Sequence, residues 1–255
     1  MSPCIRLGTA GWNVAKEHAH AFPLAGSHLE RYAQVFDAVE VNSSFYRPHR
    51  VSTYQRWAAS VPETFRFAVK IPKVVTHERR LRDADELLDR FLAEVGGLDP
   101  KLGPLLVQLP PSLAFEPRVA DEFLRDLRRR TEGPIACELR HGSWFTPEVE
   151  ELLDELRIGR VAADPAPTPG ADRLGGWAEL TYVRLHGAPR IYYSSYDDEA
   201  IHAIMTQLTR RAAEGSECWC IFDNTATFAA TGNALTARSR LRSSPVEASA
   251  DPTPL

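Results

Sequence analysis

The densest group of reactive side chains lies in the stretch Pro134–Phe145, which opens with a short apolar run and then carries Glu138, Arg140, His141 and Trp144. An apolar run of this length before a glycine predicts a buried strand that leads into a loop. Because alternate residues of a strand face the same side, Glu138 and Arg140 are expected on one face. Opposite charges on one face of an apolar strand indicate a site rather than a surface.

Other predicted strands also end in polar side chains. These residues are Glu40, Asn42, Lys70, Gln108, Asp164, Arg184, His186, Asp223 and Asn224. In a parallel α/β barrel the carboxyl ends of the strands converge on one mouth, where the active sites of such barrels are built. Burying so many ionisable groups is costly unless they have a use. The pattern therefore predicts a functional site at the mouth, although barrels also bury some polar pairs that only satisfy one another.

Proton transfer is the chemistry that these residue types favour. Glu138 and His186 are the candidate pair, one as general base and the other as general acid. Glu40 and Asp164 complete the predicted catalytic set. A serine or cysteine nucleophile is not supported, because there is no GxSxG motif and Cys137 lies inside a predicted strand.

Cations at the strand ends predict an anionic substrate. Arg140 and Arg184 could fork a carboxylate or a phosphate, with Lys70 as a third cation. The alternative is that the two arginines pair with Glu138 and Glu40, as buried ions in barrels often do.

Further substrate contacts are expected from the loops and strand ends around this mouth. Besides the three cations, the predicted binding set contains Trp12, Asn42, Tyr46, His77, Gln108, His141, Trp144, Tyr192, Asp223 and Asn224. Its aromatic members could stack on a base or a sugar ring. The alternative for each aromatic residue is ordinary packing.

A divalent metal is an alternative that the acidic residues allow. Glu138, Asp164, His186 and Asp223 could hold one. No HxH or HExxH spacing supports such a site, and no other cofactor is predicted.

The elements that must position these residues alternate along the chain. Strands are predicted at residues 5–9, 38–42, 65–71, 104–109, from 134 onward, and at 159–164, 179–186 and 217–224. Helices are predicted at 28–37, 52–59, 83–95, 117–130, 147–156, 197–214 and 231–241, with Ser52 and Thr146 as N-caps and a loop at 43–48.

Eight strands that alternate with helices indicate parallel pairing through crossover connections. Eight such units in about 240 residues fit an α/β fold of the (β/α)8 TIM-barrel-like type, as a single domain over residues 1–242. Residues 243–255, rich in Ser, Pro and Ala, are predicted to be a disordered tail. A doubly wound open sheet is the alternative, but the first turn after residue 7 matches GxGxxG poorly.

Composition narrows the partners. The chain is 44% hydrophobic and 25% charged, which is typical of a folded domain, and its net charge of −4 does not favour nucleic-acid binding. A small-molecule or nucleotide-like ligand is expected instead. The absence of a signal-peptide pattern and of any membrane-spanning run predicts a cytoplasmic protein without membrane association. The oligomeric state is not predicted.

Several motifs also match a known family. They are Gly8–Trp12, Val39–Arg47, Lys70 with Thr76 and His77, Gln108–Pro111, Glu138–Trp144, Tyr182–Gly187, and Phe222–Asn224 with Asn233 and Ala234. With these motifs the sequence resembles the YecE-like family, also catalogued as domain of unknown function 72. The resemblance implies a TIM-barrel-like fold and no settled activity. Asp223 departs from the asparagine common in that family, and Asn13–Lys16 replace a segment that commonly holds an aromatic residue.

These observations predict an acid–base enzyme, a hydrolase or a lyase, that acts on a small anionic substrate bearing a phosphate or a carboxylate. One alternative is a metal-dependent phosphodiester or nucleotide hydrolase. Another is a non-catalytic ligand-binding barrel. Both alternatives use the same mouth.

Overall fold

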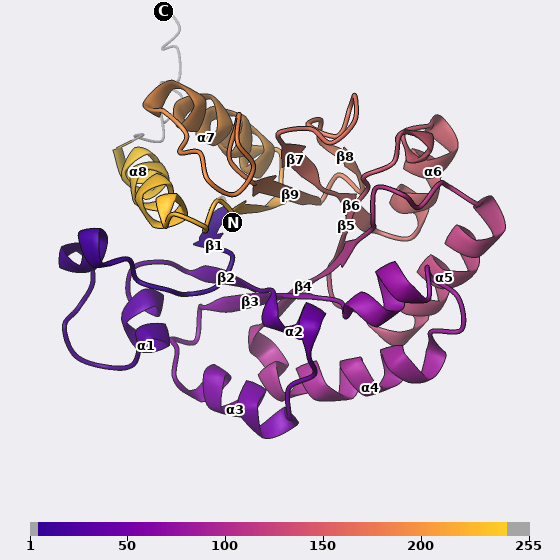
Figure 1. The fold of residues 1–255 in the computed structure, drawn as a ribbon, viewed down its shortest axis with the longest axis horizontal. Coiled ribbons are helices and arrows are strands. Elements are labelled where there is room, and N and C mark those ends of the chain that lie inside the picture. The colour runs from indigo at the N-terminus through magenta and orange to yellow at the C-terminus, as the bar shows by residue number, and fades with distance from the viewer. Residues whose placement is uncertain (1–4, 244–255) are drawn as a thin grey trace, which may run out of the picture.

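The computed structural model describes residues 5–243, so the tail predicted for residues 243–255 lies outside the described residues from position 244 onward. Two sheets make up the centre of the molecule (Figure 1). In the first, the strand order is β1 (Ile5–Thr9), β10 (Glu217–Phe222), β9 (Leu180–Leu185) and β7 (Ala162–Asp164). In the second, it is β2 (Ala38–Val41), β3 (Arg66–Lys70), β4 (Leu102–Gln108), β5 (Ile135–Glu138), β6 (Ile158–Arg160) and β8 (Gly175–Gly176).

All pairs of neighbouring strands are parallel except β6 and β8. The sheets meet where a parallel bridge joins Ala10 to Glu40, and the backbone N–H of Gly11 donates to the carbonyl of Glu40 at 2.9 Å. They also share a chain segment, because only Val161 separates β6 from β7. The fold is a mixed, mostly parallel α/β domain with a TIM-barrel-like arrangement.

Helices lie on the outside of the strands (Figure 1). They are α1 (His28–Ala33), α2 (Ser43–Tyr46), α3 (Val51–Ala59), α4 (Asp85–Val95), α5 (Pro117–Arg130), α6 (Pro147–Glu155), α7 (Asp198–Ala213) and α8 (Ala229–Ser243). Shorter helical turns are η1 (Lys16–Ala21), η2 (Val74–Glu78), η3 (Gly96–Lys101) and η4 (Gly142–Trp144). Parallel strands need such crossovers, because the end of one strand and the start of the next lie at opposite ends of the sheet.

The inner layer of the core is closely filled. Small residues on three strands, Ala38, Ala68 and Ala136, belong to the same buried cluster as Tyr182 and Trp219, whose rings stack 5.9 Å apart. A larger buried layer lies between the strands and the helices. Bulky side chains fill the inside, and the buried ions Glu40, Glu138 and Arg184 lie toward the carboxyl ends of their strands.

The predicted strands are all present, with the sixth divided at Val161. The predicted cap at Thr146 is confirmed, because its side chain accepts from the N–H of Val149. The cap predicted at Ser52 is wrong, since α3 begins one residue earlier and Arg50 precedes it without a side-chain cap. The loop predicted at 43–48 is also partly wrong, because its first residues form α2.

Candidate active site

Arg184 is the centre of a buried ionic cluster. Its guanidinium donates to both oxygens of Glu40, at 2.9 Å from Nε and 2.6 Å from Nη2. It also donates to Glu138 Oε2 at 2.5 Å and to Asp223 Oδ2 at 2.9 Å. Three carboxylates therefore surround one cation that is fully buried. Such an arrangement is stable only when nearly every charge has a partner.

Glu138 is held as a carboxylate by its neighbours. Besides Arg184, its Oε1 accepts from Arg140 Nε at 2.6 Å and from Gln108 Nε2 at 3.0 Å. Burial raises the pKa of Glu138, but the charges of Arg184 and Arg140 more than offset burial and keep that pKa well below its usual range. Both oxygens of Glu138 are consequently occupied acceptors.

His186 and Asp223 form an oriented pair. The Nδ1 of His186 lies 3.0 Å from Asp223 Oδ2 and must donate, because an ionised carboxylate only accepts. The other ring nitrogen, Nε2, is buried, lies 3.5 Å from Glu138 Oε1 and makes no hydrogen bond with any residue of 5–243. Burial lowers the pKa of His186, but its contacts with the carboxylates of Asp223 and Glu138 raise it overall. The arrangement leaves one nitrogen free to exchange a proton.

Lys70 and His77 both contact the ring of Phe45 next to these carboxylates. The Nζ of Lys70 lies 4.0 Å from the centre of the Phe45 ring, and the same ring meets the edge of His77 at 4.9 Å. Burial, and then the charge of Arg184, lower the pKa of Lys70 to about 8. Burial and the charge of Lys70 lower the pKa of His77 to about 4, so this imidazole is neutral at neutral pH.

Arg140 and Tyr192 lie toward solvent. The side chain of Arg140 keeps 20% of its surface exposed, and only its Nε is bonded among the described residues, to Glu138. Tyr192 is 40% exposed, and its ring lies 5.8 Å from that of His186, edge to face. The outer nitrogens of Arg140 therefore make no hydrogen bond to any residue of 5–243.

The structure brings eight of the predicted site residues into this cluster. They are Glu40, Lys70, Gln108, Glu138, Arg140, Arg184, His186 and Asp223. His77 and Tyr192 lie beside it. Of the two alternatives for the arginines, Arg184 pairs with Glu40 and Glu138, while Arg140 pairs with Glu138 through one nitrogen and keeps the rest free.

Other predicted residues lie apart from the cluster. Asp164 accepts from the hydroxyl of Tyr196 at 2.7 Å. Asn224 follows Asp223 on the opposite face of the chain and donates to Asn233 at 2.8 Å. Trp144 is buried, and its Nε1 donates to the backbone carbonyl of residue 113 at 2.8 Å.

The remaining four residues come from loops and turns. His141 accepts from the N–H of Ser143 and caps η4. Trp12 packs against another tryptophan, at position 57, with ring centres 5.0 Å apart. Tyr46 is 79% exposed on α2. Asn42 precedes α2, and its buried Oδ1 makes no hydrogen bond to any residue of 5–243.

Two residues of the site were not among those predicted. The hydroxyl of Tyr182 donates to Glu40 Oε2 at 2.9 Å. Its signal is present in the sequence, because Tyr182 lies two residues before Arg184 and thus on the same face of β9. Phe45 supports Lys70, but nothing in the pattern of a short loop indicates that contact.

Of the four donors predicted for a metal, Glu138, His186 and Asp223 lie in the ionic cluster and Asp164 lies apart from it. Glu138 and Asp223 both bind the guanidinium of Arg184, and Asp164 bonds to Tyr196. Within residues 5–243 no cluster of three or more His, Cys, Asp or Glu side chains is placed to hold a metal ion. A guanidinium thus lies where three carboxylates converge.

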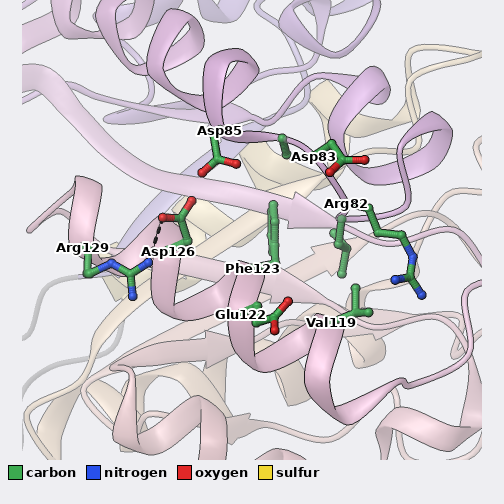
Figure 2. A pocket seen from close by; sticks show the side chains of 10 residues that line it. Arg82, Asp83, Asp85, Val119, Glu122, Phe123, Asp126 and Arg129 are labelled. Atoms are coloured by element: carbon green, nitrogen blue, oxygen red, sulfur yellow. Dashed lines mark hydrogen bonds and ion pairs between the residues drawn. The ribbon is translucent and has the colours of Figure 1, made fainter.

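A separate cleft of about 440 Å³ lies between the start of α4 and α5 (Figure 2). Its charged walls include Asp83, Asp85, Glu122 and Arg129, from the outer helices and the turn before α4. No predicted site residue lines it.

In residues 5–243 no helix is long and apolar enough to cross a bilayer.

Comparison with known proteins gives the family. Residues 6–254 match the family described as "Protein of unknown function DUF72". The chain belongs to the DUF72 family. The UPF0759 protein YecE of Escherichia coli (strain K12) is 30% identical over 175 residues, which are 66% of this chain and 61% of that protein. This DUF72 chain therefore matches less than two thirds of the length of that relative. The UPF0759 protein YunF of Bacillus subtilis (strain 168) is 31% identical over 72% of this chain and 70% of its own length.

Solved structures support the same placement. A DUF72 family protein from Thermotoga maritima is 25% identical, with a TM-score of 0.78 over 94% of this chain and 99% of the other. A fusion protein that contains a xylose isomerase-like TIM barrel is 15% identical, with a TM-score of 0.50 over 95% of this chain and 42% of the other. At that identity the likeness shows the fold alone. It supports the TIM-barrel-like arrangement of this DUF72 protein.

Proposed function

We propose that this DUF72 protein is an acid–base enzyme, a hydrolase or a lyase, that acts on a small anionic molecule. In this proposal the two sheets act as one closed (β/α)8 barrel, with the ionic cluster at its mouth. Active sites of this fold lie at the carboxyl ends of the strands. The substrate bears a carboxylate or a phosphate and includes nucleotide-like molecules, and the protein works in the cytoplasm.

The observation that carries the proposal is the imidazole of His186, which has one nitrogen in a hydrogen bond and the other without one. Asp223 holds its Nδ1, while Nε2 is buried and has no hydrogen-bond partner in residues 5–243. A buried polar atom left without a partner costs free energy, so its persistence favours a functional role. A carboxylate that fixes one imidazole nitrogen so that the other can move a proton is a recurring device in acid–base catalysis.

The proton-transfer roles follow from the charges. Because the pKa of His186 is raised, its imidazolium is the better general acid. Glu138 is ionised and lies 3.5 Å from Nε2, so it enters as the base of the pair. Glu40 fixes Arg184 and thereby the other two carboxylates, Glu138 and Asp223. Asp164 acts indirectly in this proposal, through the hydrogen bond that it accepts from Tyr196.

Substrate binding is assigned to the cations that have spare capacity. Lys70 makes no ion pair within residues 5–243, and Arg140 keeps its outer nitrogens free. An anion that reaches both would neutralise charge in a site of low polarity, where such pairs are strong. In this proposal Tyr192, whose ring contacts His186, covers the ligand, and Tyr46 and Trp12 add outer contacts.

The test begins with ligand discovery. Purified protein is screened by thermal shift against small carboxylates, phosphate esters and nucleotides, and each ligand that raises the Tm is repeated with Arg140→Ala. We expect a ligand whose stabilisation is lost in Arg140→Ala. Turnover of that ligand should fall by about 10²- to 10⁴-fold in His186→Asn, the range that general acid–base groups supply. Thermal stabilisation by the ligand should remain.

His202→Asn is the matched control, because His202 is exposed on α7 and should leave turnover unchanged. Undiminished turnover in His186→Asn would overturn the proposal. A ligand that binds without being converted would indicate the non-catalytic barrel. Turnover that requires an added divalent metal would favour the phosphodiester or nucleotide hydrolase.

A further inference from the structure

Lys70 differs from the other lysines of this chain. There are four lysines among thirty lysine and arginine residues. Lys101 is also buried, but its Nζ donates to two backbone carbonyls, at 2.8 and 2.9 Å. Lys73 is half-exposed and lies 3.5 Å from Glu78. Lys16 is exposed at the start of η1. Lys70 alone among them is buried with no hydrogen bond or ion pair from Nζ to a residue of 5–243.

If the site needed only a permanent positive charge at position 70, an arginine would serve better than a lysine. A guanidinium stays protonated and can fork an anion, whereas an ammonium can lose its proton and become a nucleophile. Most cations of this chain are arginines, including both other cations of the cluster. A lysine at the end of β3 is therefore the one cation of the site that can act as an amine.

The surroundings of Lys70 favour the amine form. The face of Phe45 covers its Nζ at 4.0 Å and excludes water from one side. Burial and the charge of Arg184 lower the pKa of Lys70, and they outweigh the carboxylates of Glu138, Glu40 and Asp223, which raise it. The neutral His77 contacts the same phenyl ring. With its pKa lowered to about 8, roughly a tenth of Lys70 is uncharged at pH 7.

We propose that Lys70 is a nucleophile that forms a Schiff base with an aldehyde or ketone bearing a carboxylate or a phosphate. The proposal rests on the proposed function, because it places the anionic end of the same substrate on Arg140. It goes further by naming a carbonyl as the reacting group and a covalent intermediate. Lysines in desolvated pockets next to another cation are activated for this chemistry.

The reaction balances without any oxidant or reductant. The neutral amine of Lys70 adds to the carbonyl carbon, and a proton moves from nitrogen to oxygen to give a carbinolamine. The C–O bond then breaks, the hydroxyl leaves with one further proton as water, and a carbon–nitrogen double bond remains. The free Nε2 of His186 supplies that proton in the same cluster. Hydrolysis reverses the sequence and restores the lysine.

Borohydride trapping tests the inference. Wild-type protein is incubated with pyruvate or with glyoxylate at pH 7, reduced with sodium borohydride and mapped by peptide mass spectrometry. We expect one dominant stable adduct, on Lys70, because burial against Phe45 and the charge of Arg184 lower the pKa of this amine to about 8. Lys70→Arg should give no adduct, and Lys73→Arg should label like the wild type.

The wild-type map decides the question even if Lys70→Arg does not fold. Adducts spread evenly over Lys16, Lys73 and Lys101, or no adduct at Lys70 although pyruvate raises the Tm, would overturn the Schiff base. The proposed function would still stand in that case if Arg140→Ala loses thermal stabilisation by the ligand and His186→Asn loses turnover of it. Failure of those two variants to change anything would remove the proposed function itself.

Discussion

Two carboxylates raise the pKa of His186, first Asp223 and then Glu138. Asp223→Asn removes the larger of these two effects, while burial and Arg184, which both lower that pKa, remain. We therefore expect the pKa of His186 to fall in this variant. Titration of the imidazole signals by NMR measures it. Asp164→Asn is the control, since Asp164 bonds to Tyr196 instead. An unchanged pKa in Asp223→Asn would show that this contact does not set the protonation of His186.

At the scale of single residues, the sequence indicates which side chains face one another along a strand. Alternation places Glu138 with Arg140, and Arg184 with His186, on common faces. It cannot give the partners that lie on strands distant in the sequence. Arg184 on β9 contacts Glu40 on β2, which lies 144 positions away along the chain, because the fold brings the carboxyl ends of these two strands together. Asp164 lies apart from the cluster because it bonds to Tyr196, which comes from a loop, and Trp144 lies apart because it belongs to the helical turn η4. The alternation of residues along a strand predicts neither position.

At the scale of elements, the junction between β1 and β2 depends on a residue without a side chain. A Cβ on Gly8 would lie 2.1 Å from the backbone carbonyl of Ala38 and 3.0 Å from the hydroxyl of Tyr32. Gly8→Ala must therefore push the two strands apart. We expect a loss of about 1–3 kcal/mol in the free energy of unfolding, the usual cost of overpacking.

Urea unfolding measures this loss. Gly96→Ala is the matched control, because nothing lies within 4 Å of its would-be Cβ. That variant should stay within about 0.5 kcal/mol of the wild type. A similar small effect for Gly8→Ala would mean that the strands separate easily at this junction.

The order and type of the main elements could be predicted because apolar runs and helical periods are local signals. The bounds of α5 agree with the prediction at both ends. Failures occur where distant contacts decide. β6 and β7 divide at Val161 because the first half pairs with β5 and the second with β9. No local pattern marks that change of partner.

At the scale of the whole molecule, the cluster makes stability depend on pH. The pKa values of Glu138 and Asp223 are lowered in the folded state, in each case by the charge of Arg184 against the effect of burial. Their stabilising contribution is present above their unfolded pKa values, near pH 4, and is lost as the pH falls through the folded values. His186 has the opposite sign, because its raised pKa stabilises below about pH 6.5 and that contribution is lost at higher pH.

We expect the free energy of unfolding to fall steeply below about pH 4 and to fall slightly above the pKa of His186. Urea unfolding at a series of pH values measures both limbs. Glu138→Gln should reduce the acid slope, and Glu148→Gln, on the exposed start of α6, should keep it. Equal acid slopes in wild type and Glu138→Gln would show that the buried cluster does not govern the acid limb.

Glu40 belongs both to the junction of the sheets and to the ionic cluster. Its backbone carbonyl accepts from Gly11 at the bridge between β1 and β2, and its carboxylate holds Arg184. One residue therefore serves both the packing of β1 against β2 and the anchoring of the buried arginine. Substitutions at Gly8 or Ala38 that move β2 would consequently move the carboxylate that holds Arg184, although neither residue belongs to the ionic cluster.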